Sequence, residues 1–407
     1  MYGSAIIHPC RSFGEGRTVG GTQMPRSFFP ALTCALALAA VSRSFAQVQP
    51  TFNDVVFAVE PTDAGGSVTL MMDIYVPPVG NPPYPLVLWI HGGGWQSGTY
   101  NNTAGLALPL LNDGVAVASA RYRLSGEAIF PAQIHDVKGA VRFLRANAAA
   151  FQLDPARFAS WGSSAGGHLS ALLAMSAGVP ALEGATGGNL AFSSAVQVCV
   201  DYFGPTDILN INLDITNPPG GFNHDDPNSP ESRLVGWDQP GQGIGDIRAN
   251  LTNPSAPYPA LVQLCNQVNP VTWVASGAPP TFIAHGTNDT AVPIMQSTRL
   301  ADALTSASVP VHYVQVADAG HGGFPPATQT AAHEFVLAAF TSAKAAGDLN
   351  CDGARNLDDV EPFVLRLIDF SAYQSVEPTC HSRNADLNGD GQVNSRDIAA
   401  FTALILS

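Results

Sequence analysis

Short apolar runs recur along the chain from about residue 47 to residue 344, and longer helical segments separate them. A run of four to eight apolar residues between turn signals is typical of a strand that is buried on both faces, as in a parallel sheet. The runs predict strands at residues 70–76, 86–90, 115–119, 158–161, 196–200, 281–285 and 311–316.

Three segments between these runs have the residue spacing of a helix, at 134–150, 166–176 and 297–306. The first combines the apolar residues Val137, Val141, Phe143 and Leu144 with the basic residues Lys138, Arg142 and Arg145. The alternation of strands and helices predicts an α/β fold, with a doubly wound, mostly parallel sheet that carries helices on both faces.

Residues 207–258 interrupt this alternation with many turn-forming residues, as in the stretch 217–230. A long loop inside a compact domain is usually functional or disordered. We interpret this segment as an insertion over the top of the sheet that shapes a substrate pocket. A passive loop is the alternative.

The 407-residue chain has 46% hydrophobic and 12% charged residues, which is a globular composition, and its formal net charge is −14. Binding to nucleic acid or to an anionic membrane needs clustered Lys and Arg, and the sequence contains no basic run. We therefore expect no nucleic-acid partner.

Residues 1–46 have the pattern of a signal peptide, with Met24 as an alternative start. A short basic segment precedes the apolar stretch 27–41, and Ser44-Phe45-Ala46 fits the small-x-small cleavage pattern. An N-terminal membrane anchor is the alternative. No other segment is long and apolar enough to span a bilayer, so we expect a secreted, periplasmic or cell-surface protein without a membrane span after signal removal.

Four cysteines remain after residue 46, and an exported protein permits disulfides. Cys351 and Cys380 share the C-terminal region and are expected to pair. A Cys199–Cys265 bridge is a second hypothesis, and buried free thiols are the alternative for all four.

Residues 162–166 form a G-x-S-x-G motif between a predicted strand and a predicted helix. In this context Ser164 is expected at a strained turn with its hydroxyl exposed, and the N-terminus of the next helix faces the place where negative charge develops. Ser164 is therefore the candidate nucleophile.

A serine hydroxyl needs a base, and the acid and the histidine follow this motif in that order. Asp289 and His321 both follow predicted strands, where the sites of open α/β sheets gather. His321 would take the Ser164 proton and Asp289 would orient the imidazole. Asp318 is an alternative acid, whereas His285 and His168 are interpreted as structural histidines.

Three glycines follow a histidine in Trp89-Ile-His-Gly-Gly-Gly-Trp95, at the end of a predicted strand. This fold builds half of its oxyanion hole at such a position. The expected donors are the backbone N–H groups of Gly93, Gly94 and Ala165, and Trp95 is a possible substitute for one of them. A plain glycine turn is the alternative.

The motifs HGGGW, GSSAGGHLSALLA, HGTNDTAVPIMQS and AGHGG together resemble those of the α/β-hydrolase superfamily over about residues 50–343. They are most similar to its bacterial carboxylesterases, a branch that includes hormone-sensitive-lipase-like, kynurenine-formamidase-like, feruloyl and acetylxylan esterases. The resemblance implies a catalytic domain over residues 47–345 with Ser164, Asp289 and His321 as the triad, and no cofactor for catalysis.

The C-terminal residues 346–407 contain two near copies of a loop with oxygen-bearing side chains at positions 1, 3, 5, 9 and 12 and a glycine at position 6. Calcium binds several hard oxygen ligands, and this spacing wraps a loop around the ion. The predicted ligands are Asp348, Asn350, Asp352, Asn356 and Asp359 in the first copy, and Asp386, Asn388, Asp390, Asn394 and Asp397 in the second.

Two such loops, each followed by a helix, resemble a dockerin, a small all-α domain that binds calcium and docks onto cohesin modules. The resemblance implies a cohesin-like or cell-surface partner. After the ninth loop position the sequence has Leu357-Asp358 and Ser395-Arg396, where dockerins have small hydroxyl residues.

Together these features predict a secreted serine carboxylesterase that acts through an acyl-serine intermediate, with acetyl or feruloyl esters of plant polysaccharide as the first substrate hypothesis. An amidase or peptidase on the same triad is one alternative. A non-catalytic module that binds surfaces is another.

Overall fold

The computed structural model describes residues 48–101, 106–215, 222–343, 346–350, 355–369, 372–373, 376, 382–388 and 393–406. The predicted signal peptide, Cys351 and Cys380 lie outside these ranges. Among the described residues, no helix has both the length and the apolar character needed to cross a membrane.

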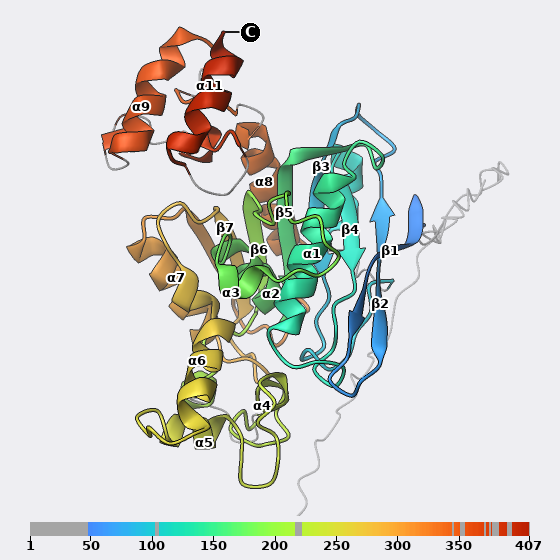
Figure 1. Cartoon of the computed structure of the whole chain (residues 1–407), viewed down its shortest axis with the longest axis vertical. Helices are drawn as coiled ribbons and strands as arrows, with labels where there is room; N and C mark the ends of the chain where they lie inside the picture. Colours follow the sequence, from blue (N-terminus) through green and yellow to red (C-terminus); the bar gives the residue numbers. More distant parts are fainter. Residues whose placement is uncertain are drawn as a thin grey trace, which may run out of the picture. The chain divides into compact units, whose positions relative to one another are not determined.

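One eight-stranded sheet forms the centre of the fold, in the order β1-β2-β4-β3-β5-β6-β7-β8 (Figure 1). The strands β1 and β2 are antiparallel additions at one edge, and the strands from β4 to β8 pair in parallel. The prediction of a doubly wound, mostly parallel sheet is confirmed. The strands are β1 (Phe52–Pro61), β2 (Ser67–Tyr75), β3 (Tyr84–Ile90), β4 (Ala116–Ala120), β5 (Leu153–Ser163), β6 (Val198–Tyr202), β7 (Thr281–Gly286) and β8 (Val311–Val316).

Every residue of β3 is buried, because side chains alternate between two covered faces of the sheet. Leu86, Leu88 and Ile90 pack in the apolar cluster that includes α1 (Ala132–Ala146), α2 (Ala165–Met175) and α7 (Met295–Ser306). Val87 and Trp89 pack in the cluster with η1 (Leu108–Asp113) and α8 (Pro326–Ala343). The continuous apolar run therefore reflects burial by helices on both sides.

The helix α1 buries two basic side chains that its sequence places beside apolar ones. Lys138 is fully buried, and its Nζ donates to the Ser176 carbonyl at 2.6 Å and to Glu183 Oε1 at 2.8 Å. Arg142 also pairs with Glu183, at the end of the short helix α3 (Pro180–Glu183). A single carboxylate thus compensates two buried cations.

The predicted insertion contains short helices rather than an irregular loop. They are η2 (Ile211–Asp214), α4 (Pro230–Leu234) and α5 (Ile244–Ala249), and α6 (Tyr258–Val268) and η3 (Pro270–Trp273) follow directly after the insertion. Figure 1 shows α4, α5 and α6 grouped beyond one end of the sheet.

The hypothesis of a Cys199–Cys265 bridge is wrong, because both thiols are free and buried. Cys199 lies within β6, where its Sγ is 3.6 Å from Ser170 Oγ, and Cys265 lies within α6. Burial raises the pKa of each thiol to about 12, so both behave as small apolar side chains.

The described residues after 346 form helices and turns. They include η4 (Leu357–Asp359), α9 (Val360–Ile368), η5 (Ser382–Ala385), η6 (Ser395–Asp397) and α11 (Ile398–Ile405). Leu349, Phe363, Tyr373, Ala385 and Phe401 form an apolar cluster of their own, and the Phe363 and Phe401 rings stack at 3.8 Å.

Candidate active site

Ser164 stands at the turn between β5 and α2, with φ 56° and ψ −126°. Its N–H donates to the Tyr202 carbonyl at 2.8 Å, which holds the turn against the neighbouring strand. A Cβ on Gly166 would lie only 2.0 Å from the Ile90 carbonyl oxygen, so the second glycine of the motif allows this close approach. The strained turn predicted for the nucleophile is present.

The structure brings Ser164, His321 and Asp289 together, although they come from three separate strand ends. His321 Nε2 is 3.0 Å from Ser164 Oγ, and His321 Nδ1 is 2.7 Å from Asp289 Oδ2. Because Nδ1 bears the proton that the carboxylate accepts, Nε2 presents its lone pair to the serine hydroxyl. This is the geometry in which an imidazole can act as a general base.

Asp289 is a buried carboxylate with several donors. Its Oδ1 accepts the N–H groups of Ala291 and Val292 at 2.8 and 2.9 Å. Burial alone would raise its pKa, but the hydrogen bonds from His285 and His321 outweigh that effect and hold the pKa well below its usual range. The carboxylate is therefore charged wherever a neutral imidazole could serve as a base.

The alternative candidates for the acid and the base, Asp318 and His285, do not occupy the triad positions. His285 is fully buried, with Nδ1 2.7 Å from Ser297 Oγ and Nε2 2.9 Å from the Val292 carbonyl, as expected of a structural histidine. It also lies 3.2 Å from Asp289 Oδ2, so it helps to fix the acid. Asp318 is exposed, and its N–H donates to Thr287 Oγ1. No hydrogen bond or ion pair among the described residues joins Asp318 to His321.

The glycine-rich loop after β3 turns sharply through three residues with positive φ: Gly93 (112°), Gly94 (59°) and Trp95 (57°). Gly94, Trp95 and Ala165 line the same pocket as Ser164. Gly93 lies in the turn itself, where its carbonyl accepts the N–H groups of Gln96 and Ser97. Within the described part of the chain, the N–H groups of Gly93, Gly94 and Ala165 donate no hydrogen bond, so they are available to a ligand.

A buried hydrogen bond that the sequence did not suggest fixes this loop to α2, the helix that follows Ser164. Trp95 Nε1–H donates to His168 Nδ1 at 3.2 Å, and His168 Nε2–H donates to the Val268 carbonyl at 2.8 Å. Burial lowers the pKa of His168 to about 4, so the ring stays neutral and keeps an acceptor for Trp95. The interpretation of His168 as structural holds. No spacing pattern in the sequence connects it to Trp95.

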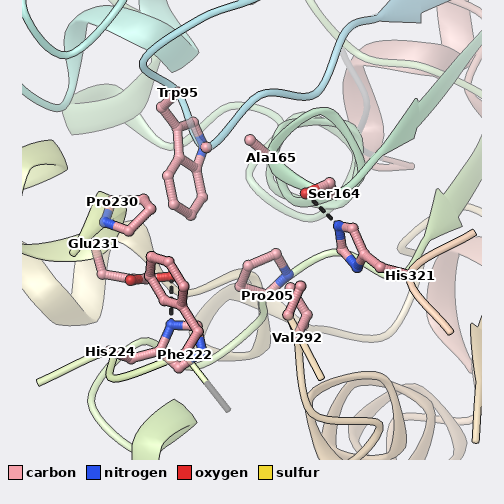
Figure 2. Close-up of a pocket in the computed structure, with 12 residues that line it drawn as sticks. Trp95, Ser164, Ala165, Pro205, Phe222, His224, Pro230, Glu231, Val292 and His321 are labelled. Carbon is pink, nitrogen blue, oxygen red and sulfur yellow. Dashed lines mark hydrogen bonds and ion pairs between the residues drawn. The ribbon is translucent and has the colours of Figure 1, made fainter. Parts of the chain in front are cut away.

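A pocket of about 120 Å³ opens in front of Ser164 and His321 (Figure 2). Phe222, His224, Pro230 and Glu231 form one part of its wall, and all four come from the insertion. The interpretation that the insertion shapes the pocket is therefore confirmed over a passive loop.

The two C-terminal loops repeat one hydrogen-bond pattern around their twelfth residues. Asp359 accepts the N–H groups of Leu349 at 2.6 Å and Asn356 at 2.9 Å. Asp397 accepts those of Leu387 at 2.9 Å and Asn394 at 2.8 Å. Oδ1 of each aspartate also accepts a second N–H group, from Asn350 at 3.3 Å and from Asn388 at 3.1 Å, whereas each Oδ2 accepts only one among the described residues. The Oδ2 atoms are therefore hard oxygen donors that remain compatible with calcium.

The predicted ligands Asp352 and Asp390 lie outside the described residues. Among the residues that are described, no three His, Cys, Asp or Glu side chains converge on a point that would hold a metal ion. Calcium binding therefore stays a prediction.

Comparison with known proteins places this site in a family. The BD-FAE family model matches residues 72–304, more than half of the chain. The esterase LipQ of Mycobacterium tuberculosis is 32% identical over 243 residues, which are 58% of this chain and 50% of LipQ. The chain thus spans about half the length of that curated relative.

Two solved structures are similar in fold and in sequence. A truncated form of a carbohydrate esterase from gut microbiota has a TM-score of 0.60 and 29% identity, over 71% of this chain and 96% of that one. A bifunctional GH43-CE protein of Bacteroides eggerthii has a TM-score of 0.58 and 31% identity, over 70% of this chain and 35% of that one. With its α/β-hydrolase-like sheet and the family match across it, this chain belongs to the BD-FAE family.

Proposed function

We propose that this chain is a serine carboxylesterase. The observation that carries the proposal is the hydrogen-bonded triad of Ser164, His321 and Asp289. Ser164 and His321 of this triad line an open pocket. Relatives of the chain are named esterases and carboxylic ester hydrolases, which supports the same chemistry.

Hydrolysis would proceed in two halves. His321 Nε2 takes the proton of Ser164 as Oγ attacks the ester carbonyl carbon, and the oxyanion accepts N–H groups of the Gly94 loop and Ala165. The C–O bond to the alcohol then breaks, and His321 returns the proton to the leaving oxygen. Water then enters, and His321 takes one of its protons as the water oxygen attacks the acyl carbonyl carbon. The bond to Ser164 Oγ breaks to release the acid, and His321 returns the proton to Ser164 Oγ.

Acetyl or feruloyl esters of plant polysaccharide are the proposed substrates. Two similar solved structures are described as a carbohydrate esterase and as a bifunctional protein with a CE part, which supports sugar esters in general. The small pocket beside Ser164 favours a short acyl group such as acetyl. An amidase or peptidase on the same triad remains the competing proposal.

The test measures hydrolysis of p-nitrophenyl acetate, acetylated xylan and an acetanilide by the full chain. Ser164→Ala is the inactive variant, and Ser163→Ala is the matched control that removes the neighbouring hydroxyl. We expect ester hydrolysis in the control only, with fluorophosphonate labelling lost in Ser164→Ala alone. Equal hydrolysis by both variants would overturn the mechanism, and faster cleavage of the anilide than of the esters would favour the amidase.

We also propose that the C-terminal region binds calcium and docks on a cohesin-like or cell-surface protein, and that the protein is exported. The repeated loops support calcium binding. An exposed apolar stripe on α9 supports docking, with Val360, Val364 and Ile368 37%, 46% and 76% exposed. We expect calcium to bind in calorimetry and to raise the unfolding temperature. The rise in unfolding temperature should vanish in the double variant Asp348→Asn/Asp386→Asn and persist in the control Asp358→Asn. If calcium leaves the unfolding temperature of the unmodified chain unchanged, the proposed calcium binding is refuted.

A further inference from the structure

The pocket wall contains an imidazole and a carboxyl group that the proposed mechanism does not use. His224 and Glu231 line its wall, and His224 Nδ1 lies 3.0 Å from Glu231 Oε1. Figure 2 shows the pair on the side of the pocket across from Ser164 and His321. Each residue is only 2% exposed, so the protein holds two titratable groups away from water beside the reaction centre.

These side chains have hydrogen-bonding capacity that the described part of the chain does not satisfy. His224 Nε2 and Glu231 Oε2 are buried atoms without a hydrogen-bond partner there. The contact between Nδ1 and Oε1 has the distance of an ion pair but not the angle of a hydrogen bond, so it leaves Nδ1 unsatisfied as well. Buried polar atoms are nearly always paired, so these exceptions at a pocket wall call for a partner, which is an ordered water, an ion or a bound ligand.

Hydrogen bonds hold the backbone segments that carry the pair. The His224 backbone N–H donates to Asn212 Oδ1 at 3.1 Å, and Asn212 Nδ2 donates to Asp225 Oδ2 at 2.9 Å. Glu231 lies in the first turn of α4, which Ser229 caps by accepting the Ser232 N–H at 3.1 Å. Fixed positions are what a group needs in order to discriminate between substrates.

The helix α4 is also joined to the oxyanion loop. Arg233 Nη1 donates to Gln96 Oε1 at 3.0 Å. A Cβ built on Gly94 would lie 3.3 Å from the Pro230 ring. The helix that carries Glu231 therefore contacts the loop beside Ser164. Because the pair and Ser164 line one pocket, a single substrate molecule can contact both.

The donor and acceptor roles of Glu231 Oε2 and His224 Nε2 determine which chemical group of a substrate can bind to the pair. Glu231 Oε2 only accepts, whereas the imidazole Nε2 accepts or donates according to its tautomer. A hydroxyl can donate to the carboxylate and accept from the ring N–H at once. An alkyl group would leave both atoms unpaired, and a carbonyl could not satisfy the carboxylate.

We infer that His224 and Glu231 form a specificity site for a hydroxyl group of the substrate near its ester bond, an inference that rests on the proposed esterase activity. The hydroxyl comes from the alcohol part, as in a sugar, or from the acyl part. A site that hydrogen-bonds a substrate hydroxyl rejects the analogue that lacks it far more strongly than an apolar pocket rejects a missing methylene.

Two matched substrate pairs test the inference with the full chain. The alcohol arm compares trans-2-hydroxycyclohexyl acetate with cyclohexyl acetate, and the acyl arm compares ethyl 3-hydroxybutyrate with ethyl butyrate. The readout is the ratio of kcat/KM within each pair, which does not depend on the folded fraction. We expect a ratio of about 10²-fold or more in one arm, and that arm identifies the source of the hydroxyl.

The double variant His224→Phe/Glu231→Leu is expected to reduce this ratio to about one, because apolar replacement of a whole buried pair is usually tolerated by the fold. Glu231→Gln, which keeps the shape, should reduce it in part, and Phe222→Leu in the same wall should keep it. Ratios near one in both arms of the unmodified enzyme, or an unchanged ratio in the double variant, would overturn the inference alone. Failure to hydrolyse even p-nitrophenyl acetate would overturn the proposed function and the inference with it.

Discussion

The hydrogen bond between Trp95 and His168 predicts that a residue outside the triad controls the rate of the reaction. Trp95→Phe removes the indole N–H that His168 Nδ1 accepts at 3.2 Å. Trp95 is 1% exposed and His168 is fully buried, so no solvent replaces the lost donor. Because His168 Nε2–H is committed to the Val268 carbonyl, the ring cannot turn to recover a partner.

The magnitude follows from these contacts. A buried acceptor left unsatisfied costs about 1–3 kcal/mol, and part of that cost disappears if the loop moves. Loss of one oxyanion donor lowers kcat by about 10²–10³-fold, and a misplacement of about 1 Å costs about 10²-fold. We expect kcat of Trp95→Phe to fall by about 10²-fold with KM nearly unchanged, since the interaction strengthens only in the transition state.

The assay is steady-state hydrolysis of p-nitrophenyl acetate, with urea unfolding on the same samples. Trp161→Phe is the matched control, because Trp161 is fully buried and its Nε1 has no partner among the described residues. The control makes the same change of ring without breaking a hydrogen bond. The reasoning is refuted if Trp95→Phe keeps its kcat, or if both variants lose the same factor.

Three further predictions concern single side chains. Asp289→Asn should lower kcat by about 10⁴-fold, because the amide favours the wrong imidazole tautomer, and a loss in p-nitrophenyl acetate hydrolysis of less than tenfold would contradict this role. Burial raises the pKa of Asp201 to about 6 from 3.8, so its stabilising contribution below pH 4 is lost as the pH rises through 6. In urea unfolding, Asp201→Asn should therefore be more stable than the unmodified chain by up to about 3 kcal/mol at pH 8, and equally stable at pH 4. A difference in unfolding free energy that stays constant across this pH range would contradict the raised pKa of Asp201. Glu183→Gln leaves the buried Lys138 without its counter-charge and should lower the unfolding free energy by about 3 kcal/mol. Adding Lys138→Met to this variant should restore part of the loss. Unchanged unfolding free energies in both variants would argue against a buried ion pair.

The central strands and the order of the triad could be predicted because each leaves a pattern within a short stretch of the sequence. A strand covered on both faces must be apolar throughout, as β3 is. Ser164 carries a local motif, and Asp289 and His321 directly follow apolar runs, so the topology alone brings them to one edge of the sheet.

The edge strand β1 had no such signal. Phe57 and Ala58 are buried, but the apolar side chains of Val56 and Val59 are exposed, and the pairing with β2 shifts register, so apolar residues and burial do not alternate together. The burial of Lys138 in α1 could not be predicted either, because the carboxylate that permits it, Glu183, lies 45 residues away in the sequence. Both features depend on partners that are distant in sequence, and a pattern within one segment cannot reveal them.

The insertion illustrates the same limit and shows why it matters for substrate choice. Its turn-rich composition predicted a loop, yet long-range polar contacts anchor it to the sheet's helices. Gln296 of α7 is fully buried, accepts the N–H groups of Thr206 and Asp207 at 2.8 Å each, and donates to Asp214 Oδ2 at 2.7 Å. A segment anchored in this way presents fixed groups to the pocket, as at His224 and Glu231. The triad residues at the strand ends would then determine which bond is cleaved, and the insertion would determine which ester arrives there, so the two can change independently in sequence.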